Sequence, residues 1–173
     1  MNRRTMLAGS FAGAFLPTRR QPRAQGSTDV IPIEIRIDSI RVLATVERIS
    51  IDGGVMQSPS NLAFAGWYEE SAGIAASGNT LMTGYYHWGG LDALFSTLAL
   101  IEIDEKIVIT GGNGRQYEYR VAIVQTVDKK TANLQEIVGP TSQPSLTLIT
   151  DAGIPDPITG AFPRSTIVRA VRI

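Results

Sequence analysis

Few residues of this chain are equipped for covalent chemistry, and the most reactive type is absent. The 173 residues include no cysteine, so the chain can form no thiolate nucleophile, no disulfide and no cysteine-ligated metal site. It has a single histidine, His87, and histidine is the residue that most often moves protons in active sites. One histidine without a second ligand or a thiol forms neither a metal site nor a catalytic pair by itself.

The other polar and aromatic groups of the chain lack the spacing of a binding or catalytic site. Glu69-Glu70 and Asp104-Glu105 do not have the spacing of a calcium loop and are interpreted as solvated surface charges. Gly111, Gly112 and Gly114 do not lie between a strand and a helix, so they do not form a phosphate cradle. Trp67 and Trp88 are interpreted as packing anchors and not as ligand platforms. We therefore expect neither a metal nor a cofactor.

The charge distribution argues against nucleic acid as a partner. Five of the sixteen basic residues lie in the first 26 positions, whereas none of the sixteen acids does. From residue 27 onward the formal charge is 11 − 16 = −5, and the lysines and arginines are scattered. A body of this kind offers no basic stripe to a phosphate backbone.

The N-terminus has the composition of an export signal. Arg3 and Arg4 precede an apolar run that ends at Leu16, and small residues follow it. This pattern predicts a signal peptide or uncleaved anchor over 1–26 and a separate domain over 27–173; a folded N-terminal helix is the alternative. The twin arginine suggests the Tat route, although a general secretory signal looks similar. We expect an exported protein, released or tethered to the outer face of the membrane through this segment alone.

The body of the chain has the sequence pattern of short strands separated by turns. Apolar residues alternate over 30–51, which predicts strand structure with one buried face. A loop-rich stretch over 56–78 leads to a short buried strand at 80–83, and helical spacing over 91–100 predicts a short helix or 3₁₀ turn. Further strands are predicted at 106–110 and 115–127, which form a hairpin, and at 145–150 and 164–172. Seven or eight short strands favour a closed or nearly closed all-β barrel with one or two short helices.

Several motifs, in order and in spacing over about 33 to 173, resemble those of the sortase family. They are the strand 37–42 (Ile-Asp-Ser-Ile-Arg-Val), Gly66-Trp67-Tyr68, the run 78–84 with Trp88-Gly89-Gly90 and Leu94-Phe95 after it, the strand 146–150 (Leu-Thr-Leu-Ile-Thr) and the strand 164–170. The chain looks most similar to single-domain sortases of classes E and F. The resemblance implies an eight-stranded barrel that cuts a cell-wall sorting signal through a cysteine thioester and passes the acyl group to an amine.

The resemblance also places the family's site, and two of its three positions are substituted. A histidine is expected after Gly84, where this chain has Tyr85, and a cysteine after Thr150, where it has Asp151. Arg164 stands where the family has an arginine that donates hydrogen bonds to the oxyanion. We interpret Asp151 as half of an Asp151–Arg164 ion pair that seals the cleft and holds the carboxyl ionised; a nucleophilic Asp151 is the alternative.

The neighbouring aromatic and histidine residues are open to two interpretations. His87, two residues beyond Tyr85, faces the same side of an extended chain about 6–7 Å further along, so it either reaches into the cleft or lies on the surface. Tyr85 can donate a hydrogen bond but is no proton-shuttling acid at neutral pH.

Two functional hypotheses follow. In the first, the chain is an inert, monomeric sortase-like module that binds a sorting-signal-like peptide, a partner protein or a glycan of the cell wall. In the second, it retains hydrolase or transpeptidase activity through Asp151, His87 and Arg164.

Overall fold

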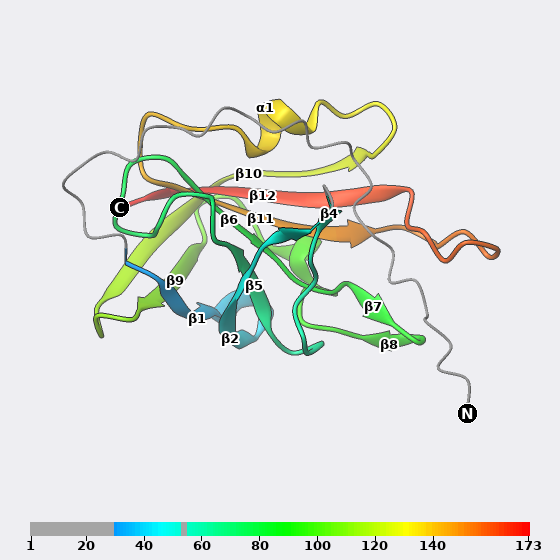
Figure 1. Ribbon diagram of the computed structural model, residues 1–173, viewed down its shortest axis with the longest axis horizontal. Coiled ribbons are helices and arrows are strands. Elements are labelled where there is room, and N and C mark those ends of the chain that lie inside the picture. The colour runs from blue at the N-terminus through cyan, green and yellow to red at the C-terminus, as the bar shows by residue number, and fades with distance from the viewer. Residues whose placement is uncertain (1–29, 53–54) are drawn as a thin grey trace.

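The computed structural model describes residues 30–52 and 55–173, and eight of its strands close into one barrel (Figure 1). The strand order around the barrel is β1-β2-β5-β6-β11-β12-β10-β9, and β9 pairs with β1 to close it. This confirms the predicted all-β barrel. The predicted export segment at 1–26 lies outside the described residues. The barrel strands are β1 (Pro32–Ile37), β2 (Val42–Ile49), β5 (Ala65–Tyr68), β6 (Asn79–Thr83), β9 (Lys106–Gly111), β10 (Gln116–Asp128), β11 (Ser145–Ala152) and β12 (Arg164–Arg172).

Short elements decorate the barrel. The two-residue strands form two small sheets, one on each of two loops. These elements are β3 (Ile51–Asp52) with β4 (Val55–Met56), β7 (His87–Trp88) with β8 (Leu91–Asp92), the 3₁₀ helices η1 (Asp38–Ile40) and η2 (Leu98–Leu100), and the helix α1 (Leu134–Val138). Among the described residues no helix is both long and apolar enough to cross a bilayer.

The first alternating run divides into two strands, and the stretch 37–42, which the resemblance assigned to a strand, holds the turn between them. Antiparallel β1 and β2 are joined by the 3₁₀ turn η1, which ends at Arg41 with a left-handed φ of 56°. A register shift between Pro32 and Glu34 then turns Ile33 outward, where it is 46% exposed, while Ile35 is fully buried. A β-bulge of this kind breaks the period of two, which explains why the alternation did not reveal the exposed Ile33.

The later elements follow their sequence patterns closely. The predicted hairpin is β9 with β10, and its turn contains Gly114 at a φ of 76°. The predicted short buried strand is β6, and the last two predicted strands are β11 and β12. The barrel strand β5, which lies inside the stretch assigned as loop, and the helix α1, which lies in the connector after β10, were not predicted. The predicted helical segment at 91–100 holds β8 and η2, so its pattern is only partly helical.

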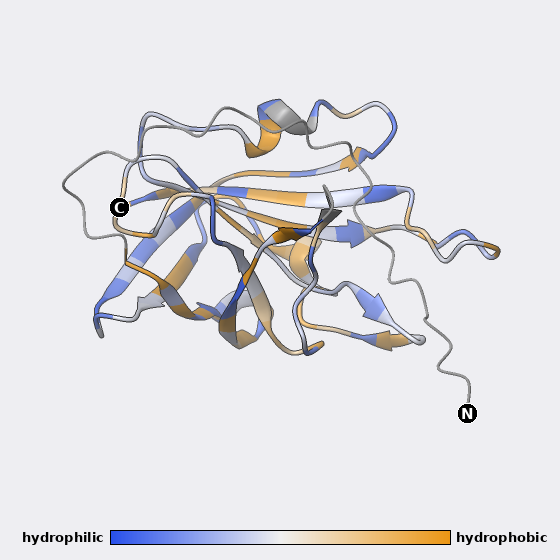
Figure 2. Cartoon of the chain, viewed as in Figure 1, coloured by the Kyte–Doolittle hydropathy of each residue, from blue (hydrophilic) through white to orange (hydrophobic). Residues whose placement is uncertain are grey.

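Apolar side chains pack on both faces of the β6-β11-β12 part of the wall. The larger cluster fills the barrel and includes Ile35, Phe95, Leu146 and Val168. A smaller cluster of Leu81, Ile149 and Ile167 lies on the opposite face, with Ile137 and Val138 of α1 packed against it. Segments of opposite hydropathy alternate along several barrel strands (Figure 2). The strands that hold the site are thus buried on both faces, which fixes their register.

Candidate active-site cleft

Three adjacent strands carry the positions at which the sequence predicted a site. β6 pairs in parallel with β11, and β11 pairs antiparallel with β12. The end of β6, the end of β11 and the start of β12 therefore lie at one end of the barrel. The β7–β8 hairpin and the loop between β11 and β12 extend from this end, opposite the C-terminus (Figure 1). These two loops can therefore form the walls of a cleft.

A cleft of about 610 Å³ opens at this end of the barrel. Three of the four predicted site residues line it, namely Tyr85, His87 and Asp151, and Arg164 does not. Its walls come from the segment 56–59, the segment 83–90 and the β11–β12 loop. The lining side chains are mainly aromatic or apolar, with Asp151 as the one carboxylate among the described residues that form it. The cleft is large enough for several residues of an extended peptide.

Backbone carbonyls and threonine hydroxyls fix the cleft floor. The Thr150 hydroxyl donates to the Gly84 carbonyl oxygen at 2.8 Å, and the Thr83 hydroxyl donates to the Ile149 carbonyl oxygen at 3.0 Å. Gly84 lies so close to the Phe95 ring that a Cβ atom there would come within 2.6 Å of it. A glycine is thus required where the chain leaves β6, and the two hydroxyls tie this exit to β11. The spacing between residues 85 and 151 is consequently rigid.

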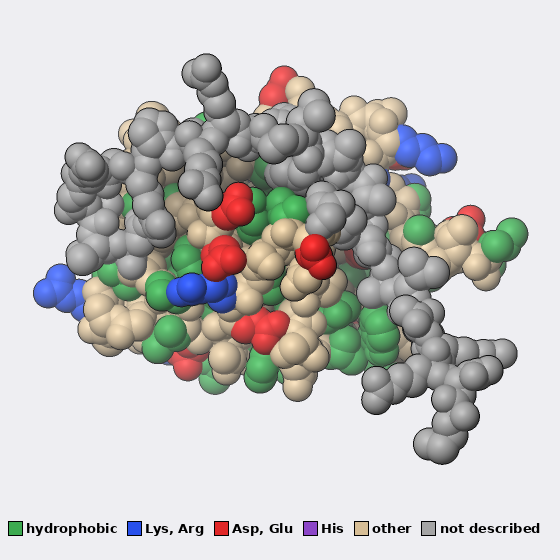
Figure 3. All heavy atoms as spheres, in the orientation of Figure 1, with side chains coloured by type: hydrophobic (Ala, Val, Ile, Leu, Met, Phe, Trp, Pro, Cys, Tyr) green, Lys and Arg blue, Asp and Glu red, His purple; other side chains and the backbone are tan. Residues whose placement is uncertain are grey.

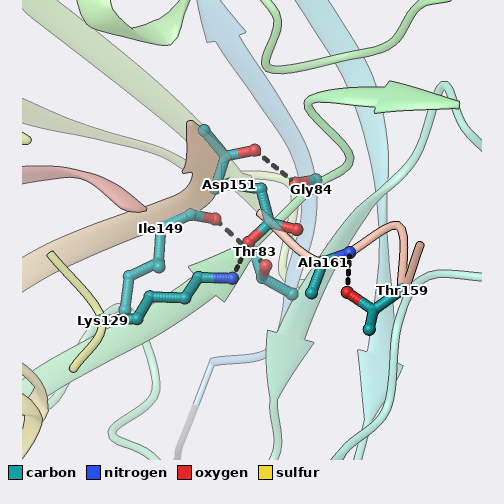
Figure 4. A network of polar contacts seen from close by, with 8 residues as sticks. Thr83, Gly84, Lys129, Ile149, Asp151, Thr159 and Ala161 are labelled. Atoms are coloured by element: carbon teal, nitrogen blue, oxygen red, sulfur yellow. Dashed lines mark hydrogen bonds and ion pairs between the residues drawn. The ribbon is translucent and has the colours of Figure 1, made fainter. Parts of the chain in front are cut away.

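Lys129 is the cation that pairs with Asp151. The Lys129 ammonium donates to Oδ1 of Asp151, and both side chains are largely buried (Figure 4). Burial raises the pKa of the Asp151 carboxyl above its ordinary value, although the hydrogen bond and positive charge of Lys129 act in the opposite direction. The expected ion pair implies a lowered pKa, whereas the shift of the Asp151 pKa is upward because desolvation outweighs the pairing.

Arg164 does not form the expected ion pair with Asp151. In the β11–β12 ladder Arg164 stands opposite Ala152, whereas Asp151 stands opposite Ser165. Successive side chains of a strand point to opposite faces, so Asp151 shares its face with Ser165 and not with Arg164. Arg164 is exposed. The sequence placed the arginine on the correct strand, but the pairing needs a register that the sequence alone does not give.

His87 is held by a partner on the facing strand of its hairpin. His87 pairs with Asp92 in the β7–β8 ladder, and 3.0 Å separates the imidazole Nδ1 from Oδ1 of Asp92. The imidazole is one-third exposed and lines the cleft. Of its two interpretations, the structure supports the one in which His87 reaches the cleft wall. A carboxylate at Nδ1 leaves Nε2 as the nitrogen available to a ligand.

Aromatic rings pack edge to face along the cleft walls. The Tyr85 and Trp88 ring centroids lie 5.5 Å apart, and those of Tyr86 and Phe162 lie 5.6 Å apart. The first contact is within the segment after β6, and the second joins that segment to the β11–β12 loop. Trp88 is 38% exposed, while Trp67 is buried in the barrel. The predicted packing role thus fits Trp67, whereas Trp88 lines the cleft.

The β11–β12 loop is internally hydrogen-bonded. Oδ1 of Asp156 accepts from the Ile158 and Thr159 amides at 2.9 and 2.7 Å, and these bonds lower the pKa of the Asp156 carboxyl. The Asp156 amide in turn donates to the Ala161 carbonyl oxygen at 2.9 Å. The loop therefore presents Pro155, Gly160 and Phe162 to the cleft as a preformed wall.

The described residues include no group of three or more histidine, cysteine or carboxylate side chains arranged to hold a metal ion. On the face of the molecule shown in Figure 3, the lysine and arginine side chains lie apart from one another.

A family model described as "Sortase domain" matches residues 35–172. No curated protein matches the chain. Among solved structures, sortase A from Corynebacterium diphtheriae is 22% identical with a TM-score of 0.62, and the match covers 86% of this chain and 63% of that one. This chain therefore spans less than two thirds of that protein.

Two further sortase structures match this chain with similar TM-scores. Sortase C-1 from Actinomyces oris is 15% identical with a TM-score of 0.64, covering 81% of this chain and 72% of that one. Listeria monocytogenes sortase A is 17% identical with a TM-score of 0.61, and the match covers 84% of this chain and 88% of that one. Identities this low establish a common barrel. The likeness to classes E and F stays a prediction.

Proposed function

Because the chain belongs to the sortase family, we propose that its cleft binds an extended peptide at the cell surface and performs no thiol-dependent acyl transfer. The peptide would resemble a sorting signal or a peptide of the cell wall. The protein would act as a monomer, exported by its N-terminal segment. Its role would be to recognise a ligand and not to transform it.

The observation that carries this proposal is the Lys129–Asp151 pair at the cleft floor. A sortase needs a thiolate where this chain has Asp151, and the chain contains no cysteine. Attack by a carboxylate on an amide would give an anhydride, which is far more reactive than a thioester, while expelling an amine. Oδ1 of Asp151 is moreover engaged by an ammonium, which draws electron density from the carboxylate. The cleft itself remains open and preformed.

Binding can be tested by capture of peptides from a defined pool of sorting-signal-like sequences, read by mass spectrometry. Ser58 is exposed and lines the cleft, so Ser58→Trp should obstruct it and abolish capture. Gln125 is exposed on β10 and does not line the cleft, so Gln125→Trp is the matched control. Equal capture by the two variants would show that the peptides bind elsewhere, and no capture by the unmodified protein would refute the proposal.

The second candidate is a cysteine-independent hydrolase, and the raised pKa of Asp151 is what favours it. A carboxyl shifted toward neutral pH is better suited to general acid or base catalysis than an ordinary one. Incubating the protein with the same peptide pool and analysing products in water and with added glycine amines distinguishes the two candidates. Efficient cleavage that Asp151→Ala abolishes would establish the hydrolase and overturn the binding role.

A further inference from the structure

The loop between β11 and β12 projects from the cleft end of the barrel and has apolar side chains at its tip (Figures 1 and 3). Ile154 and Ile158 are 86% and 93% exposed, the highest values among the large apolar residues that the structure describes. Neither lines the cleft, so a ligand in the cleft leaves them uncovered. Apolar residues scattered over a surface need no partner, but two on one projecting tip indicate a contact.

The backbone of this tip does not depend on water for its hydrogen bonds. Over 155–161 every backbone amide is either absent, at the two prolines, or hydrogen-bonded within the loop. In addition to the bonds to the Asp156 carboxylate, the Gly160 amide donates to the Asp156 carbonyl oxygen at 2.8 Å, and the Ala161 amide donates to Oγ1 of Thr159 at 3.3 Å. An N–H group that leaves water without a partner is costly. This tip can therefore leave water without stranding a donor.

The shape of the tip suits a lipid bilayer better than a protein partner. A stable protein interface buries about 800 Å² of each partner over a matched surface, whereas this tip offers two side chains on a convex projection. A bilayer adapts to a projection of this kind, and its acyl region accommodates aliphatic side chains. Leu91, which is 68% exposed on the β7–β8 hairpin, adds an apolar side chain at the same end of the barrel.

We propose that Ile154 and Ile158, at the tip of the β11–β12 loop, insert into the surface of a lipid bilayer. The same loop forms a wall of the cleft, so insertion holds the cleft beside the membrane. The contact is apolar and needs no anionic lipid, because Asp156 is the one charged residue over 152–163 and its carboxylate bonds within the loop. The proposal goes beyond the proposed function, since peptide binding in the cleft does not require it.

A fluorophore at the tip tests the insertion, because a chain without cysteine can be labelled at one introduced thiol. Ile158→Cys in the full chain is labelled with nitrobenzoxadiazole and mixed with phosphatidylcholine vesicles. The emission should shift to shorter wavelength, and vesicles with nitroxide groups on their acyl chains should quench it. Ile123→Cys, at an exposed isoleucine of β10, is the matched control and should show neither change. Replacing half of the lipid with phosphatidylglycerol should not alter the result.

Second substitutions in the chain labelled at position 158 separate the tip from the label and from the cleft. Ile154→Asp should abolish both the shift and the quenching, because a carboxylate is costly in the acyl region. Gln125→Asp adds the same charge at an exposed position of β10 and should leave both unchanged. Ser58→Trp, which obstructs the cleft, should also leave both unchanged. A failure of peptide capture is thus distinguishable from a failure of insertion.

Three outcomes would overturn the proposal. The first is a label at position 158 that stays in water, whether the protein sediments with the vesicles or remains in solution. The second is a shift that survives Ile154→Asp, because the label and not the tip would then drive insertion. The third is a shift that grows with protein concentration when no vesicles are present, because the tip would then contact a second copy of the chain.

Discussion

The ammonium of Lys129 donates to the Asp151 carboxylate across strand β12. Lys129 directly follows β10, Asp151 is on β11, and β12 lies between these two strands. In the ladders, Ser165 of β12 stands opposite both Asp151 and Val127. Lys129 is two residues beyond Val127, and residues two apart share a face of a strand. The register of three strands thus brings this lysine to the face of the sheet on which Asp151 lies.

The pKa of Asp151 predicts how stability depends on pH. Because the folded protein raises this pKa above the unfolded value, the folded state binds the proton more tightly. The stabilisation associated with the group is therefore present at low pH and is lost as pH rises through the folded pKa. Asp151→Asn lacks this titration, so its free energy of unfolding relative to the unmodified protein should increase as pH rises above about 4. Urea denaturation of both proteins across this range measures the difference, and a constant or falling difference would contradict the prediction.

The close approach of Gly84 to the Phe95 ring predicts that one added methyl group at residue 84 lowers the stability of the fold. Gly84→Ala would place Cβ within 2.6 Å of the Phe95 ring, which is fully buried. Overpacking of this kind should lower the free energy of unfolding by about 1–3 kcal/mol. Gly112→Ala is the control, because its Cβ meets nothing closer than 3.6 Å. Denaturant melts should separate the two variants, and equal stability would show that the Phe95 ring moves aside freely.

Local signals predicted most of the barrel. The β9–β10 hairpin followed from two alternating runs around a glycine-rich turn, and β6, β11 and β12 followed from their apolar, β-branched sequences. β5 was missed because its four residues, Ala65–Tyr68, are too few to show a period. The strand exists because its neighbours β2 and β6 supply its hydrogen bonds. That support comes from the tertiary structure, which no local pattern reports.

The site was predictable in position but not in its ion pair. The resemblance placed Tyr85 and Asp151 in one site, and both line the cleft. Lys129 was not considered, because it lies in a polar connector that has no motif. Arg164 was assigned as the partner because the resemblance places the arginine of the site there, but strand alternation directs it away from Asp151. A sequence motif identifies which strand a residue occupies, whereas a one-residue difference in register decides what it contacts.

The N-terminal sequence predicts that the mature domain lies outside the cytoplasm. A tagged full-length chain should fractionate with the membrane or the medium, and a chain that lacks residues 2–26 should stay in the cytoplasm. Arg3→Lys with Arg4→Lys should block export if the Tat route is used, whereas Arg19→Lys with Arg20→Lys is the matched control. Full-length protein found solely in the cytoplasm, with no effect of Arg3 and Arg4, would contradict the prediction.

The cleft should regain acyl chemistry when both substituted positions are restored. The unmodified protein has no thiol, so iodoacetamide should leave it unchanged. Asp151→Cys combined with Tyr85→His should form a covalent acyl-enzyme with a sorting-signal-like peptide, detected by intact mass, because both positions line one cleft. Either substitution alone should give much less, since nucleophile and acid act as a unit.

The same variants also test whether Lys129 supplies the cation of the site. In the Asp151→Cys background its ammonium should lower the pKa of the introduced thiol, because a nearby cation stabilises the thiolate. Adding Lys129→Gln should then shift the pH dependence of iodoacetamide alkylation to higher pH, whereas adding Arg164→Gln should shift it less, because Arg164 stands opposite Ala152. A larger shift from Arg164→Gln would mean that the arginine reaches position 151 once the aspartate is gone, and the Lys129 assignment would then hold for the unmodified protein alone.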